Sequence, residues 1–161
     1  MEANQIIIEH PNRDKAASKA TKATVLLLLL VSVALMLIVT IGGWDVLQGA
    51  KPVQIAYILI YLIMAYYVSR WNRGVLPVAA ALAILLLIFA AVAIPGWVDR
   101  DQSGYAQPAI DSGILAIVTA LIIPVQVLLI GFAMRAFNQA WNVEIERTTD
   151  RPPGHAAPHP A

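Results

Sequence analysis

Four long apolar stretches without a single charged side chain dominate this chain of 161 residues. The stretches are Thr24–Gly43, Val53–Ser69, Val75–Ile94 and Ser112–Met134. An α-helix rises about 1.5 Å per residue, so about 20 apolar residues cross the ~30 Å hydrocarbon core of a bilayer. The pattern therefore predicts an all-α integral membrane protein, with four transmembrane helices forming a domain over residues 24–134.

The composition excludes several chemistries. Only 13% of the residues are charged, against about a quarter in an average soluble domain, and cysteine is absent. Thiol redox chemistry, cysteine-ligated zinc and iron–sulfur clusters are thereby excluded. All three histidines lie outside the apolar stretches, which excludes haem held between two histidines inside the bundle. The stretches also lack the embedded glutamate on which small multidrug antiporters depend.

The distribution of basic residues predicts the orientation. The terminal segments and the second loop hold nine of the eleven Lys and Arg residues: Arg13, Lys15, Lys19, Lys22, Arg70, Arg73, Arg135, Arg147 and Arg151. The first and third loops hold only Lys51 and Arg100. Because basic loops stay in the cytoplasm, the count predicts two antiparallel hairpins in the cell membrane, with both termini cytoplasmic.

Tryptophan gives an independent signal, since its amphipathic ring favours the membrane interface. Trp44 and Trp97 are expected at the outer interface, and Trp71 and Trp141 at the inner one.

Three further segments lie outside the membrane domain. Residues 1–23 form a basic leader. Over residues 135–147 we expect a cytoplasmic extension of the fourth helix, because Phe137, Trp141 and Ile145 fall on one helical face. Residues 148–161 are rich in proline and histidine and are expected to be a disordered tail.

Uncharged polar residues form stripes along three of the stretches. Ser32 and Thr40 are eight residues apart in the first, Gln54, Tyr57 and Tyr61 recur at helical spacing in the second, and Thr119 and Gln126 are one heptad apart in the fourth. Such residues commonly make hydrogen bonds between membrane helices, of about 0.6 kcal/mol each. The alternative is a polar cavity, which would be lined by Tyr57, Tyr61, Thr119 and Gln126.

The most specific local motif lies in the third loop, where Asp99, Asp101 and Ser103 alternate ahead of Gly104. These residues resemble positions 1, 3, 5 and 6 of an EF-hand calcium loop. The resemblance breaks at position 12, which is Ile110 where the EF-hand has a bidentate glutamate, and Asp111 follows one place late. It implies a weak calcium site formed by Asp99, Asp101, Ser103 and Asp111. The alternative is an ordinary turn in which Asp111 or Ser112 caps the fourth helix.

No nucleophile with a neighbouring base, no paired carboxylates at membrane depth and no phosphate loop are evident in the sequence. We therefore expect no enzymatic activity and no required cofactor. The first hypothesis is a non-catalytic accessory or scaffolding subunit of a larger membrane complex. Its partners would be membrane lipids and other membrane subunits or further copies of the chain, not nucleic acid. The alternatives are an oligomeric channel or carrier with a neutral polar cavity, and a lipid-binding or lipid-modifying protein with an outer divalent-metal loop.

Overall fold

The computed structural model of this protein describes residues 6–148, most of which are helical. Four helices are long and apolar enough to cross a membrane: α2 (Ala16–Gly42), α3 (Lys51–Ser69), α4 (Leu76–Val98) and α5 (Ser112–Asn138). Shorter helical segments are α1 (Pro11–Asp14), η1 (Arg73–Val75) and η2 (Asp99–Asp101). The length and composition of the four helices make the chain a multi-pass membrane protein. The tail predicted over residues 148–161 lies almost entirely outside the described residues.

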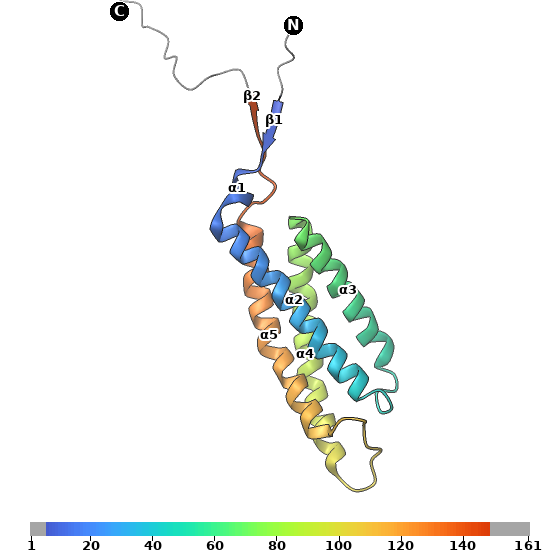
Figure 1. The fold of residues 1–161 in the computed structure, drawn as a ribbon. Coiled ribbons are helices and arrows are strands. Elements are labelled where there is room, and N and C mark those ends of the chain that lie inside the picture. Colours follow the sequence, from blue (N-terminus) through green and yellow to red (C-terminus); the bar gives the residue numbers. More distant parts are fainter. Residues whose placement is uncertain (1–5, 149–161) are drawn as a thin grey trace, which may run out of the picture.

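The four helices lie side by side, and consecutive helices run in opposite directions (Figure 1). One end of the bundle carries residues 43–50 and 99–111, and we call it the loop end. The opposite end carries the short strands β1 (Ile6–Glu9) and β2 (Ile145–Thr148), and we call it the strand end. Helix α5 packs extensively on α4 and α2, whereas α3 packs on α2 and makes few contacts with α4.

The helices extend beyond the apolar stretches that predicted them. Helix α2 begins at Ala16, ahead of Thr24, because the intervening Ala, Ser, Lys and Thr residues are compatible with a helix although they are not all apolar. Helix α4 continues past Ile94 to Val98 and includes Pro95. Hydropathy marks the part of a helix that fits the hydrocarbon core, and helix propensity decides where the helix ends.

The helical extension predicted over residues 135–147 is wrong beyond Asn138. Helix α5 ends there, Ala140 adopts a left-handed φ of 49°, and β2 pairs antiparallel with β1, Ile145 facing Glu9. The β-branched residues of this segment favour a strand, and the partner strand lies at the other end of the sequence. A tertiary pairing therefore overrides the helical periodicity, and the described fold contains a two-stranded sheet besides its helices.

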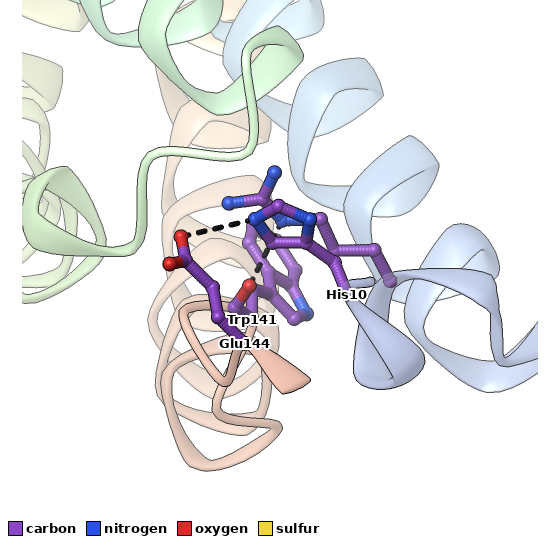
Figure 2. A network of polar contacts seen from close by, with 4 residues as sticks. His10, Trp141 and Glu144 are labelled. Carbon is purple, nitrogen blue, oxygen red and sulfur yellow. Dashed lines mark hydrogen bonds and ion pairs between the residues drawn. The ribbon is translucent and has the colours of Figure 1, made fainter. Parts of the chain in front are cut away.

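Hydrogen bonds tie the two terminal segments together at the strand end. The Asn12 Nδ2 donates to the Ala140 carbonyl at 3.0 Å, and the Arg13 Nε donates to the Trp141 carbonyl at 2.9 Å. His10 and Glu144 point toward one another beside Trp141, with 3.1 Å between Nε2 and Oε1 (Figure 2). Trp141 is completely buried, so its ring is part of the protein core at this end of the bundle.

Small side chains allow the closest helix packing. Ala79 and Ala83 of α4 are completely buried, as are Ala133 and Ala136 of α5. Small residues let helix backbones approach closely in a membrane, where lipid gives no hydrophobic reason for helices to associate. This accounts for the extensive contact between α4 and α5.

Candidate functional site

A buried hydrogen-bond network crosses the middle of the bundle. The Tyr61 hydroxyl donates to Gln126 Oε1 at 2.9 Å, and Gln126 Nε2 donates to Ser32 Oγ at 2.9 Å. The Ser32 hydroxyl in turn donates to the Leu28 carbonyl at 2.7 Å. Tyr61, Gln126 and Ser32 are all 0% exposed. Because these groups satisfy one another, they join α2, α3 and α5 without an orphaned polar atom.

A cavity of about 450 Å³ lies between this network and the loop end. Its walls come from all four long helices and from the α2–α3 loop, and most of them are apolar. Binding sites for small molecules usually have volumes of about 300–1,000 Å³ and mainly apolar walls with a few polar groups. This loop-end cavity is therefore of the size and character of a ligand site.

The buried network forms the floor of the loop-end cavity. Met36, Tyr57 and Ile122 line the cavity from α2, α3 and α5. The residues four positions further toward the strand end on the same three helices are Ser32, Tyr61 and Gln126. Because residues at i and i+4 lie one above the other on a helix, the network closes the cavity one turn below these lining residues.

The cavity arises from the composition of α4 and from the position of α3. Helix α4 contributes the small residues Ala90, Ala93 and Gly96 to the cavity wall, between the larger Leu86, Phe89 and Trp97. Helix α3 packs on α2 and makes few contacts with α4. Val53 of α3 and Phe89 of α4 line the cavity and are also about half exposed, at 49% and 50%. The cavity therefore opens between α3 and α4, on the side of the bundle that would face lipid.

Few polar side chains line the cavity. The Thr119 hydroxyl donates to the Leu115 carbonyl of its own helix at 2.7 Å, so its proton is already used. The Tyr57 hydroxyl has no hydrogen-bond partner among the described residues, and its ring packs edge-on against Phe89, with 6.1 Å between centroids. Tyr57 thus presents an unused donor to the cavity.

Gln54 is the second polar residue with spare donors. Its Oε1 accepts from the Thr40 hydroxyl, which also lies 2.6 Å from the Met36 carbonyl. Thr40 has one hydroxyl proton to give, so the Gln54 amide is assigned either as its acceptor or, flipped, as its donor. In both arrangements at least one N–H of Gln54 remains for another acceptor.

Arg100 completes the set at the rim, where η2 follows α4. Its Nη2 lies 3.5 Å from the Val46 carbonyl, at the limit of a hydrogen bond. Among the described residues, no carboxylate lies within 4.0 Å of its guanidinium group. The rim thus carries a half-buried cation without an ion-pair partner in this part of the chain.

The structure divides the four residues of the predicted polar cavity into two pairs. Tyr57 and Thr119 line the loop-end cavity, whereas Tyr61 and Gln126 hydrogen bond to each other in its floor. The prediction did not include Arg100 or Gln54. Gln54 precedes Tyr57 by three residues in the same helical stripe, and this spacing is the sequence signal by which it could have been included.

In the acidic loop, the Asp111 carboxylate accepts hydrogen bonds from the backbone N–H groups of Gly113, at 2.9 Å, and Ile114, at 3.2 Å. Asp111 is therefore the N-cap of α5, as the alternative to the calcium site predicted. Asp99, Asp101 and Ser103 are exposed. Within residues 6–148, no three His, Asp or Glu side chains gather closely enough to hold a metal ion. The calcium site stays a prediction.

Comparisons of the chain with protein-family models, with curated proteins and with solved structures find no match.

Proposed function

We propose that this multi-pass membrane protein is non-catalytic and binds a membrane lipid, holding an acyl chain in the loop-end cavity. The observation that carries the proposal is an apolar cavity of about 450 Å³ that opens between α3 and α4. A hydrocarbon chain fills such a cavity through van der Waals contacts with its apolar walls and needs no charged partner. Lateral access suits a ligand that arrives from within the bilayer.

We place the strand end in the cytoplasm and the loop end outside, in the cell membrane. The excess of basic residues in the terminal segments and in the second loop supports this orientation. The cavity would then lie in the outer half of the bundle, within reach of lipids of the outer leaflet.

The paired network beneath the cavity favours lipid binding over transport by a single chain. Ser32, Tyr61 and Gln126 are fully buried and fill the level at which a polar passage would have to continue. A channel or carrier built from this chain would need its pathway between copies. A purified protein that conducts ions as a monomer in planar bilayers would contradict the proposal.

Native mass spectrometry of the purified protein, supplied with a phospholipid of defined chains, tests the proposal. We expect the wild type to retain one lipid per chain. Ala90→Phe fills the cavity and abolishes retention, whereas Ala91→Phe, its exposed neighbour outside the cavity, leaves retention unchanged. Ala93→Phe is a second cavity variant, at a more exposed position that tolerates the larger ring. Retention by both cavity variants at the wild-type level would overturn the proposal.

A scaffolding role in a larger complex is the second candidate, and one feature favours it. Ile7 and Ile8 in β1 are 48% and 56% exposed on a sheet that projects from the bundle. A short exposed strand pairs readily with an extended segment of another protein. Mild solubilisation at native expression tests this role: we expect a membrane partner to co-purify with the wild type and to be lost in Ile7→Lys with Ile8→Lys. Isolation of the wild-type chain alone would contradict it.

A further inference from the structure

The loop-end cavity is lined by three side chains whose donors are not fully used within the described protein. They are Arg100 at the rim, Gln54 in the first turn of α3 and Tyr57 in the next turn. Tyr57 is buried, at 8% exposed, and a buried donor without an acceptor is unfavourable by about 1–3 kcal/mol in protein data; Gln54 and Arg100 are partly exposed. Three donors around one cavity indicate a ligand that brings acceptor oxygens as well as an apolar chain.

We propose that this ligand is a zwitterionic phospholipid of the phosphatidylethanolamine class. Its phosphate would contact Arg100, its ester oxygens Gln54 and Tyr57, and one acyl chain would occupy the apolar part of the cavity. This inference rests on the proposed function and adds the identity of the headgroup.

The order of the polar groups matches the order of groups in a phospholipid. Arg100 lies in η2, at the loop end, and α3 runs from there toward the strand end, so Gln54 is nearer the rim and Tyr57 deeper. Beyond Tyr57 the lining is apolar, with Met36, Leu86 and Ile122. A phospholipid likewise runs from phosphate through ester oxygens to hydrocarbon. An apolar ligand without acceptor oxygens would leave the buried Tyr57 hydroxyl without a hydrogen-bond partner.

The charges around the rim favour a zwitterion over an anion. A guanidinium group forms paired, charge-assisted hydrogen bonds with phosphate oxygens. Asp99 and Asp101 flank Arg100 in the chain, and Asp45 precedes Val46, whose carbonyl faces the Arg100 guanidinium. These three carboxylates are exposed. They would repel a lipid with net negative charge and attract the ammonium group of an ethanolamine headgroup.

Binding of three lipids with identical acyl chains tests the inference. Phosphatidylethanolamine, phosphatidylglycerol and diacylglycerol are titrated separately into the detergent-solubilised full chain, and native mass spectrometry measures the bound fraction. For the wild type we expect the highest affinity for phosphatidylethanolamine and the lowest for diacylglycerol. Arg100→Gln should lower the affinity for phosphatidylethanolamine about tenfold, as expected for loss of one charge-assisted contact. It should leave diacylglycerol binding unchanged.

Lys51→Gln is the matched control, because it removes the other cation of the loop end. The Lys51 Nζ lies 4.6 Å from the centre of the Trp44 ring, and Lys51 does not line the cavity. Equal effects of Arg100→Gln and Lys51→Gln would overturn the headgroup assignment, as would equal wild-type affinities for the three lipids. Neither result contradicts the lipid site itself, which is overturned only if Ala90→Phe and Ala93→Phe both retain lipid at the wild-type level.

Discussion

Helix α4 carries alanines in both halves of the bundle, but they have different structural consequences in the two halves. In the strand-end half, Ala79 and Ala83 are completely buried within the packed core. In the loop-end half, Ala90 and Ala93 line a cavity. A small side chain only permits close approach, and whether a neighbouring helix closes in decides the outcome. Helix α3 follows α2 and makes few contacts with α4, so the space beside Ala90 and Ala93 stays open.

The same substitution at two positions one heptad apart on α4 tests whether the space beside Ala90 is available. Ala83→Leu adds atoms where no space exists, and we expect it to lower the free energy of unfolding by about 1–3 kcal/mol. Ala90 is also buried, at 4% exposed, but it borders the cavity, so Ala90→Leu has space for the added atoms and we expect a smaller loss. Unfolding of both variants in mixed detergent micelles measures the difference. Equal destabilisation would mean that the cavity is not an available space.

The polar groups give the next largest contrast. Gln126→Leu removes the acceptor of Tyr61 and the donor to Ser32 between helices, and we expect a loss of about 1–2 kcal/mol. In the loop-end half, Thr119→Val removes a hydroxyl that bonds only to its own helix, and we expect almost no loss.

A double-mutant cycle of Gln126→Leu with Tyr61→Phe isolates the direct bond. The coupling free energy should be near the average of about 0.6 kcal/mol for such pairs in membranes. A coupling of zero would show that the network contributes shape to the cavity floor and no net hydrogen-bond energy.

At the loop end itself, Asp111→Ala tests whether the acidic loop caps a helix or holds calcium. Loss of the cap should lower the free energy of unfolding by about 1 kcal/mol, equally with and without millimolar calcium. Asp99→Ala with Asp101→Ala should have little effect, because both side chains are exposed. If calcium stabilised the wild type but not this double variant, the result would instead support the calcium site.

The four long helices could be predicted from the sequence because the hydropathy of each stretch alone is enough to identify a membrane-spanning helix. Thr24–Gly43 identified α2, although the helix begins at Ala16, and the stretch from Ser112 identified the start of α5. The pairing of β1 with β2 was not predictable in this way. It joins segments at opposite ends of the chain, and the periodicity of Phe137, Trp141 and Ile145 favoured a helix there.

The site was predictable only in part, for a related reason. Helical spacing placed Gln54, Tyr57 and Tyr61 on one face of α3, and the structure shows that this face points inward. The spacing does not give the distance to the neighbouring helices at each position along the bundle axis. Tyr57 therefore lines a cavity, whereas Tyr61, one turn away, is fully buried and donates a hydrogen bond to Gln126. Arg100 lies outside the apolar stretches, and only the tertiary fold brings it to the rim.

At each end of the bundle, a lysine side chain lies over a tryptophan ring. The Lys22 Nζ lies 4.1 Å from the centre of the Trp71 ring, which packs edge-to-face on the buried Trp141 at 5.1 Å. At the loop end, the Lys51 Nζ lies over Trp44, which is 45% exposed. Cation–π contacts at exposed sites contribute about 0.5–1 kcal/mol. The strand-end pair thus packs on a buried tryptophan, whereas the loop-end pair is partly exposed.

We therefore expect Lys22→Gln to lower the free energy of unfolding by about 0.5 kcal/mol and Lys51→Gln by less. Near-ultraviolet circular dichroism reports on the packed tryptophan pair, and its signal should weaken in Lys22→Gln alone. A larger effect of Lys51→Gln would mean that the loop end is the more rigid half.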